Sequence, residues 1–378
     1  VIGVRSYSDD PAMVSEYATA FFKGLQQKVL ATGKHFPGHG DTHLDSHLAL
    51  PKVGYDRTRL EKIELVPFKQ AIQAGIHALM TSHIDFPAFT EGGLPATLSK
   101  KCLTDFLRHE LKFEGLIVTD GMEMKAVQDT YGTAEAASMA VQAGANLVCI
   151  CHTYDLQIQA FSRFKTAVLS GELPIEVLDE RVSRVLKYKA LLNTHIINQT
   201  FIGIEPIVNN ETHRAYALQT VRSAATLVKG QAYQPWGKTF FIGVSPQVTS
   251  GADDTKGDYL ITKTIKSVLP GLGRYLMPVN PTIETIAEIV SKAKAYDQVV
   301  VTTYNGNIYQ NQLKLISELQ AVHPEVYVVS MRNPYDLHFN PEIKNYVCLY
   351  EYTPNSMHIL IEYLQGQLTL KGRLPIHG

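Results

Sequence analysis

The sequence predicts an α/β protein, in which a partial (β/α)8 barrel of the TIM type is followed by a second α/β sandwich domain. Two observations support this fold class. From residue 13 to about residue 190, short apolar runs alternate with longer amphipathic stretches, a pattern typical of β/α units around a parallel sheet. Beyond residue 212, β-branched runs alternate with helical patterns again. With 378 residues and 45% hydrophobic content, the chain is long enough for two domains with full cores.

The first domain shows four clear apolar runs. We predict strands near Val29–Lys34, Ala78–His83, Leu116–Asp120 and Asn146–Cys151, and helices near Ala12–Gln27, Glu61–Ala74, Thr104–Leu111 and Ala134–Ala143. Four strands cannot close a barrel of eight, and the chain opens on "VIGVRSYS" without an initiator Met. We therefore expect the N-terminal part of the barrel to be absent. An open doubly wound sheet, which needs no closure, is the alternative fold.

All four predicted strands end in polar or reactive residues, namely Lys34-His35, Ser82-His83, Asp120 and Cys151-His152. In a (β/α)8 barrel the active site lies at the carboxyl ends of the strands. We therefore expect these residues to share one rim. For His83 and His152, the simpler interpretation is that of rim histidines whose polar atoms are satisfied by neighbours.

A polar stretch without helical periodicity separates the two domains. It follows the basic helix predicted at Glu180–Leu192, and it places the domain limits at 1–195 for the barrel, 196–212 for the linker and 213–378 for the C-terminal domain. In the latter we predict a helix at His213–Val228 and strands at Thr239–Val244, Gln298–Thr303, Val326–Ser330 and Tyr346–Tyr350. The Gly271-Leu272-Gly273 segment has Leu276 where a dinucleotide fingerprint needs its third glycine, so we predict no nucleotide site there.

The composition argues against some partners. The formal net charge is −1, and no block of like charge could follow a phosphate backbone, so we expect no nucleic acid partner. No apolar run is long enough to span a membrane. The four cysteines form no zinc-type pair, and the Cys149/Cys151 spacing on an apolar run indicates a buried strand.

The segment "KHFPGHGDTHLDSH" places His39, Asp41, His43, Asp45 and His47 at every second position. On a strand, all five would face one side and suit a metal-dependent hydrolase. The proline and glycines favour a turning loop instead, and ligands on other elements are not evident. We therefore predict no metal and no other cofactor.

An acid/base function asks only that Asp45 orient and charge the His47 imidazole. The carboxylate would fix the ring tautomer and raise the pKa, leaving the other nitrogen able to donate a proton near neutral pH. Asp-x-His alone also fits a surface loop. For the remaining members of the row we expect loop hydrogen bonding by His39 and solvent exposure for His43.

Asp120 follows the apolar run "GLIVT", at the rim where a barrel enzyme keeps its nucleophile. An aspartate at this position could equally be a helix N-cap, because Glu123 stands at the spacing of a capping box. The residues alone leave both interpretations open, with Glu123 as the reserve carboxylate.

Taken together, five segments resemble glycoside hydrolase family 3, and within it the β-N-acetylglucosaminidase branch that acts in cell-wall recycling. They are "VIGVRSYS" (1–8), "KHFPGHGDTHLDSH" (34–47), "PATLS" (95–99), "GLIVTDGMEMKAV" (115–127) and "AGANLVCICH" (143–152). The likeness runs through the first 190 residues in order, and the C-terminal domain resembles the second domain of two-domain bacterial members. Relatives begin with further β/α units that this chain does not show.

The resemblance implies a retaining double displacement on carbohydrate substrates, with no cofactor. Asp120 would be the nucleophile, and His47 with Asp45 the acid/base dyad that replaces the usual second carboxylate. Arg5, Lys34 and His35 would bind sugar hydroxyls, although Arg5 by itself also fits a surface arginine near a chain end. The neutral imidazole of His47, in place of a second carboxylate beside Asp120, avoids the repulsion between two negative charges. It could therefore admit a phosphate ion as acceptor. The expected activity is exo-β-N-acetylglucosaminidase; a phosphorylase, a non-catalytic carbohydrate-binding fragment and a metal-dependent hydrolase are the alternatives.

Overall fold

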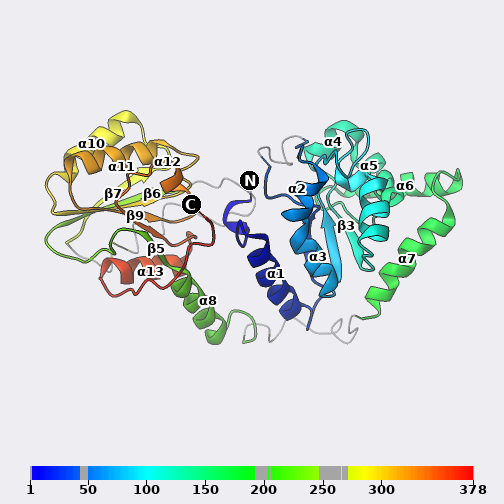
Figure 1. The fold of residues 1–378 in the computed structure, drawn as a ribbon, viewed down its shortest axis with the longest axis horizontal. Helices are drawn as coiled ribbons and strands as arrows, with labels where there is room; N and C mark the ends of the chain where they lie inside the picture. Colours follow the sequence, from blue (N-terminus) through cyan, green and yellow to red (C-terminus); the bar gives the residue numbers. More distant parts are fainter. Residues whose placement is uncertain are drawn as a thin grey trace. The chain divides into compact units, whose positions relative to one another are not determined.

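The computed structural model describes residues 2–42, 50–191, 203, 206–246, 265 and 271–377. The chain divides into two compact units, Val1–Gln199 and Thr200–Gly378, and each unit is built around its own β-sheet (Figure 1).

The sheet of the first unit has four parallel strands in the order β1-β2-β3-β4. They are β1 (Thr32–Phe36), β2 (Ala78–Thr81), β3 (Leu116–Gly121) and β4 (Leu147–Cys149). The order follows the sequence without the reversal that marks a doubly wound sheet, so the winding is that of a barrel. The predicted α/β fold is confirmed. Within the described residues, β1 and β4 each pair on one side only.

Helices connect and cover these strands (Figure 1). They are η1 (Gly3–Arg5), α1 (Pro11–Leu25), α2 (Arg57–Lys62), α3 (Leu65–Gln73), η2 (Ala96–Leu98), the π-type helix η3 (Lys101–Glu110), α4 (Lys125–Tyr131), α5 (Thr133–Ala143), α6 (Tyr154–Leu169) and α7 (Ile175–Lys189). The single helix predicted at Glu61–Ala74 is wrong: the backbone breaks at Ile63 and makes two helices. Helix α6 was not predicted, because Tyr154 and Phe161 lie on its surface at 70% exposure and its two buried residues, Ala160 and Ala167, are small.

The two faces of this sheet pack against different partners. Ile117 belongs to the large core that the outer helices cover, whereas Leu116 and Val118 point to the other face and contact Val185 and Tyr188 of α7. Because side chains alternate along a strand, Asp120 continues the row of Leu116 and Val118. The carboxylate therefore lies on the inner face of the sheet, at the carboxyl end of β3.

A stack of aromatic rings holds the end of β1 against the outer helices. Phe36 is fully buried, and its ring lies 6.1 Å from that of Phe106, which itself stacks on Phe89 with ring centroids 4.3 Å apart. Truncating such a buried phenylalanine typically costs about 3–5 kcal/mol. The strand end that carries His35 is thus anchored by the residue next to it.

The second unit has a six-stranded sheet in the order β5-β10-β9-β8-β6-β7, with β5 antiparallel at one edge. The strands are β5 (Thr226–Lys229), β6 (Thr239–Ser245), β7 (Gly273–Pro278), β8 (Gln298–Thr303), β9 (Val326–Ser330) and β10 (Asn345–Cys348). The helices are α8 (Glu211–Ala224), α10 (Ile283–Ala293), α11 (Asn311–Val322), α12 (Asp336–Phe339) and α13 (Pro354–Leu364). The five parallel strands follow the 2-1-3-4-5 order of a flavodoxin-like, doubly wound sheet.

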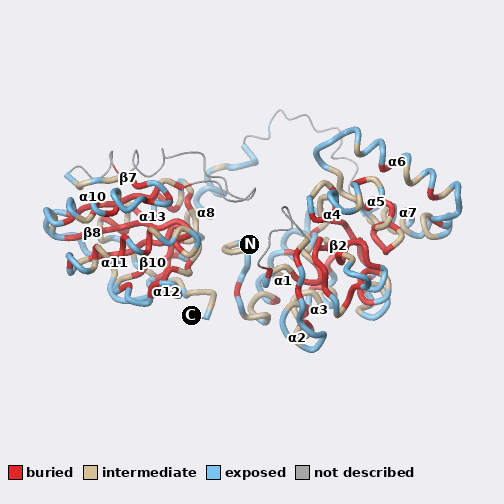
Figure 2. The backbone as a smooth tube through the Cα atoms, turned by 90° about the horizontal axis from the view of Figure 1, so that it is seen from above, coloured by how far each residue is buried: buried red, intermediate tan, exposed pale blue. Residues whose placement is uncertain are grey.

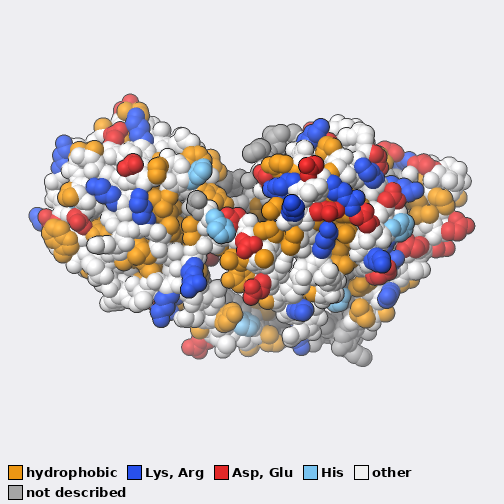
Figure 3. All heavy atoms as spheres, in the orientation of Figure 1, with side chains coloured by type: hydrophobic (Ala, Val, Ile, Leu, Met, Phe, Trp, Pro, Cys, Tyr) orange, Lys and Arg blue, Asp and Glu red, His pale blue; other side chains and the backbone are white. Residues whose placement is uncertain are grey.

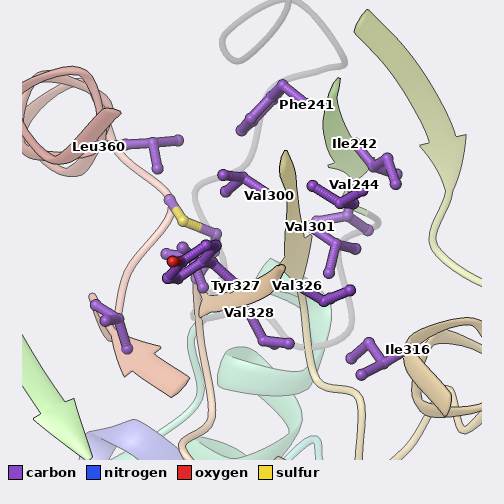
Figure 4. Close-up of a cluster of buried hydrophobic side chains, with 14 of the residues drawn as sticks. Phe241, Ile242, Val244, Val300, Val301, Ile316, Val326, Tyr327, Val328 and Leu360 are labelled. Carbon is purple, nitrogen blue, oxygen red and sulfur yellow. The ribbon is translucent and has the colours of Figure 1, made fainter. Parts of the chain in front are cut away.

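Strand β8 and strand β9 have the bounds that the sequence predicted. The helix predicted to reach Val228 ends at Ala224 instead, because Thr226–Lys229 pairs with β10 as an edge strand. Strand β7 was missed, since only Met277 of its six residues is buried and it carries no apolar run. Figure 4 shows the centre of this core, where Val300 and Val301 of β8 lie among side chains of β6 and β9.

Figure 2 shows that the buried residues concentrate in the strands of both units, whereas α6 and α7 are largely exposed or half-buried. On the face drawn in Figure 3, acidic and basic side chains are interspersed, in keeping with the net charge of −1. Among the described helices, none has both the length and the apolarity needed to cross a bilayer.

Candidate active site

Asp120 is presented at the carboxyl end of β3 with its side chain 23% exposed. Its Oδ1 accepts a hydrogen bond of 2.8 Å from the backbone N–H of Gly121. Helix α4 begins only at Lys125, and its N-cap, Met124, makes no side-chain capping bond. The interpretation of Asp120 and Glu123 as a capping box is therefore wrong. The carboxylate is held at the strand end and remains accessible.

The imidazole of His35 faces Asp120, with His35 Nε2 and Asp120 Oδ2 3.5 Å apart. Burial lowers the pKa of His35 to about 4, although the Asp120 carboxylate acts in the opposite direction. The charges of His39, Lys34 and Arg5 lower it further. At neutral pH the ring is therefore uncharged. An uncharged His35 ring forms no full ion pair with Asp120, which suits a nucleophile.

Arg5 in η1 and Lys34 in β1 are exposed and close enough to His35 for their charges to act on its ring. Arg5 comes from η1, before α1, whereas Lys34 and His35 are neighbours on β1, so two elements supply these three side chains. The structure thus brings together Arg5, Lys34, His35 and Asp120, four of the residues that the sequence singled out.

The remaining two, Asp45 and His47, lie outside the described residues, as does His43. Of the rest of the row, His39 Nδ1 lies 2.8 Å from the hydroxyl of Thr42, which confirms the expected loop hydrogen bonding. Asp41 accepts a hydrogen bond from the Tyr55 hydroxyl at 2.7 Å. Within the described part of the chain, no group of three or more His, Cys, Asp or Glu side chains is arranged to hold a metal ion.

His83 is fully buried beneath the site and ties three segments together. Its Nε2 lies 2.9 Å from the carbonyl oxygen of Gly121, and its Nδ1 lies 2.9 Å from the Thr97 hydroxyl. Thr97 Oγ1 also lies 2.8 Å from the hydroxyl of Thr81 at the end of β2. The expectation of a rim histidine satisfied by its neighbours is confirmed. Thr97 was missed as a site residue, although it belongs to the quoted "PATLS" segment.

Glu123 organises the backbone beyond β4. Its two carboxylate oxygens accept hydrogen bonds of 2.7–2.8 Å from the N–H groups of Cys151, His152 and Thr153. Burial acts to raise the pKa of this carboxyl, but the hydrogen bonds outweigh it and hold the pKa below its usual range. Glu123 is thus occupied by the backbone, so it does not serve as a reserve catalytic carboxylate. No pattern in the sequence indicates this role.

The two rim cysteines differ in their surroundings. Strand β4 ends at the half-buried Cys149, whose N–H donates to the hydroxyl of Thr119 at 2.9 Å. Cys151 lies beyond the strand and is exposed. The prediction that both cysteines belong to a buried strand is therefore wrong for Cys151, because the Glu123 carboxylate holds the backbone away from the sheet at that point.

Comparisons with known proteins identify the family. The family described as "Glycosyl hydrolase family 3 N terminal domain" matches residues 1–188. A solved family 3 β-N-acetylglucosaminidase from Paenibacillus sp. FPU-7 is 34% identical, with a TM-score of 0.87 over 100% of this chain and 73% of that chain. The chain belongs to glycoside hydrolase family 3.

Curated relatives in this family include Beta-hexosaminidase A of Pseudoalteromonas piscicida, which is 32% identical over 258 aligned positions; the match covers 62% of this chain and 42% of the relative. The Beta-hexosaminidase of Nitrosomonas eutropha is 39% identical over 156 residues, or 41% of this chain and 44% of the relative. The chain therefore spans less than half the length of these two relatives.

Proposed function

We propose that this family 3 chain carries the nucleophile and sugar-binding residues of a retaining exo-β-N-acetylglucosaminidase, which removes terminal β-linked N-acetylglucosamine from peptidoglycan-derived glycans of the cell wall. The observation that supports it best is the pairing of an accessible Asp120 carboxylate with a neutral His35 at 3.5 Å. The names of the relatives give the same sugar class.

The proposed reaction has two displacements at one carbon. The Asp120 carboxylate attacks the anomeric carbon while His47, oriented by Asp45, gives its proton to the departing glycosidic oxygen. Water then attacks the same carbon, His47 takes up a proton from it, and Asp120 leaves. Two inversions restore the β configuration. This scheme needs no metal ion or organic cofactor.

Arg5, Lys34 and His35 are proposed to position the sugar. The two cations would donate charge-assisted hydrogen bonds to hydroxyl groups, and the neutral imidazole could donate one without competing for the negative charge of Asp120.

The test is hydrolysis of a chromogenic β-N-acetylglucosaminide by the wild-type chain and by Asp120→Asn, with Asp129→Asn on the exposed surface of α4 as the matched control. We expect Asp120→Asn to lose activity by about 10³-fold or more and Asp129→Asn to retain it. Product analysis in phosphate buffer distinguishes hydrolysis from phosphorolysis, which would release a sugar 1-phosphate. Equal activity of the wild type and Asp120→Asn would refute the assignment.

Covalent trapping provides a second test of the nucleophile. An activated 5-fluoro N-acetylglucosaminide should form the first intermediate faster than it is hydrolysed, and digestion should place the added mass on the peptide that contains Asp120. A label on Glu123 instead would contradict the role assigned to both residues.

A further inference from the structure

A cavity with charged side chains in its lining lies at the opposite end of the strands from Asp120. It has a volume of about 370 Å³ and is lined by residues of η3 and α7, together with Glu114 and Gly144 from neighbouring segments. Arg108 of η3 reaches it from the amino end of the sheet, where its guanidinium donates to the carbonyl oxygen of Gly115, next to the start of β3. At about 3.3 Å per residue, the length of β3 places this cavity on the order of 13 Å from the catalytic end.

The lining of this cavity has more positive than negative charge. Arg108, Arg181 and Arg184 supply three guanidinium groups, against the carboxylates of Glu114 and Glu180. Glu180 pairs with both Arg181 and Arg184. Glu114 also pairs with Arg184 at 3.2 Å, but its side chain is 78% exposed, so water screens much of its charge. No carboxylate among the described residues pairs with Arg108, which donates instead to carbonyl oxygens and to Asn146 Oδ1.

Two guanidinium N–H groups in this cluster are buried and lack an acceptor. They are the Nε atoms of Arg108 and Arg181, and neither has a hydrogen-bond partner among the described residues. Burial lowers the pKa of Arg108 to about 10; the charges of Arg184 and Arg181 act in the same direction, and those of Glu180 and Glu114 oppose it. Leaving a buried charged donor unsatisfied costs free energy, which a bound anion would recover.

We propose that this cavity is a binding site for a phosphate group, with Arg108 on one side and Arg181 on the other. A tetrahedral oxyanion offers acceptors to the unpaired Nε–H groups of both arginines, and a cavity of about 370 Å³ has room for the rest of a small phosphate monoester. The ligand is therefore inorganic phosphate or the phosphoryl group of a phosphorylated sugar.

Binding of phosphate would stabilise the packing of α7 against the rest of the first unit. Helix α7 has no fully buried residue, and its hold on the unit depends on half-buried apolar contacts and on Arg184, which donates to the carbonyl oxygen of Glu114 at 2.6 Å. A phosphate between Arg108 and Arg181 would add a direct link between α7 and η3. Opening of α7 should then become rarer in proportion to ligand occupancy.

The experiment measures amide hydrogen exchange of α7 in the full chain, with phosphate replaced by chloride at equal ionic strength. At phosphate tenfold above its dissociation constant, we expect exchange in α7 to slow by about tenfold. Helix α13 of the second unit is the internal control and should not change. Equal protection by chloride, or slowing of α13 as well, would show a general salt effect and overturn the proposal.

Variants separate the site from other causes. Arg181→Gln should abolish the protection, and Arg181→Lys, which keeps the charge without the planar fork, should weaken it. Arg163→Gln is the matched control, because Arg163 pairs with Glu135 and Glu172 away from the cavity, and protection should persist in it. Titration calorimetry with phosphate tests binding directly; full binding by Arg181→Gln would refute the assignment.

The two sources of phosphate are distinguished by comparing inorganic phosphate with glucose 6-phosphate, and glucose serves as the blank. Tighter binding of the sugar phosphate identifies a monoester as the ligand, and equal or weaker binding identifies the free ion. Absence of binding by both at millimolar concentration would overturn the proposal.

Discussion

Asp336 in the second unit gives a prediction whose size follows from the structure. Its carboxylate is fully buried, and Oδ2 accepts a hydrogen bond of 2.5 Å from the hydroxyl of Thr303. Burial raises the pKa of Asp336 from 3.8 to about 6, and the bond from Thr303 offsets only part of this effect. The substitution Asp336→Asn keeps the shape and an acceptor oxygen but removes the charge.

The folded chain holds this proton to a higher pH than the unfolded chain does. Stability from this group is therefore fully present below pH 4 and is lost as the pH rises through about 6. The difference between a pKa of 3.8 in the unfolded chain and about 6 in the folded chain corresponds to about 3 kcal/mol of unfolding free energy. Roughly half of this contribution is lost between pH 5 and pH 8. Asp336→Asn should thus become more stable relative to the wild type by about 1.5 kcal/mol over that interval.

Urea unfolding at pH 5 and pH 8 measures this change. Trp236, the single tryptophan, lies in the second unit and reports its unfolding by fluorescence. Glu342→Gln, which removes an exposed carboxylate of the same unit, is the control and should show little dependence on pH. If the stability difference between Asp336→Asn and the wild type changed by less than about 0.5 kcal/mol between the two pH values, the reasoning on this buried charge would be refuted.

Three further outcomes are expected in the first unit. Glu123→Gln should speed amide exchange at residues 151–153 and destabilise the unit by about 1–3 kcal/mol, because an amide has one acceptor oxygen in place of two. Unchanged amide exchange at these residues would contradict the anchoring role of Glu123. Gly144→Ala should lower the free energy of unfolding by about 1–3 kcal/mol, since φ is +134° and the added Cβ would lie 2.9 Å from the Thr104 hydroxyl oxygen. Thermal unfolding measures the change, and an unchanged stability would contradict this. A thiol reagent should label the exposed Cys151 in the native chain, whereas Cys102 and Cys348 should react only after unfolding. Both of these thiols are fully buried, and burial raises their pKa values. Equal labelling of the three cysteines in the native chain, measured by mass spectrometry, would contradict this.

The sequence identified most strands because burial leaves a direct trace in residue type. Strands β8 and β9 are continuous β-branched runs, and their bounds were predicted to the residue. Helix α6 shows a less distinct apolar pattern in the sequence, because part of its apolar side chains face solvent. Local pattern therefore predicts elements that bury their apolar residues and fails for elements that expose them.

For the site, the resemblance to glycoside hydrolase family 3 singled out Arg5, Lys34, His35 and Asp120, and the structure places these four residues near one another. The sequence could not decide between a nucleophile and a helix cap at Asp120, because this depends on where α4 begins. Nor could it show that His35 is uncharged, because the pKa of an imidazole depends on burial and on charges brought close by folding.

By itself, then, the sequence determined the α/β class, the strand ends that carry polar residues and the family resemblance, all of which are properties of local pattern. Only the tertiary structure decided the 3.5 Å approach of His35 to Asp120, the use of Glu123 as a backbone anchor and the gathering of three arginines around one cavity. The physical reason is that these features join segments tens of residues apart, and hydrogen bonds and electrostatic interactions act through distances in space that the order of residues does not specify.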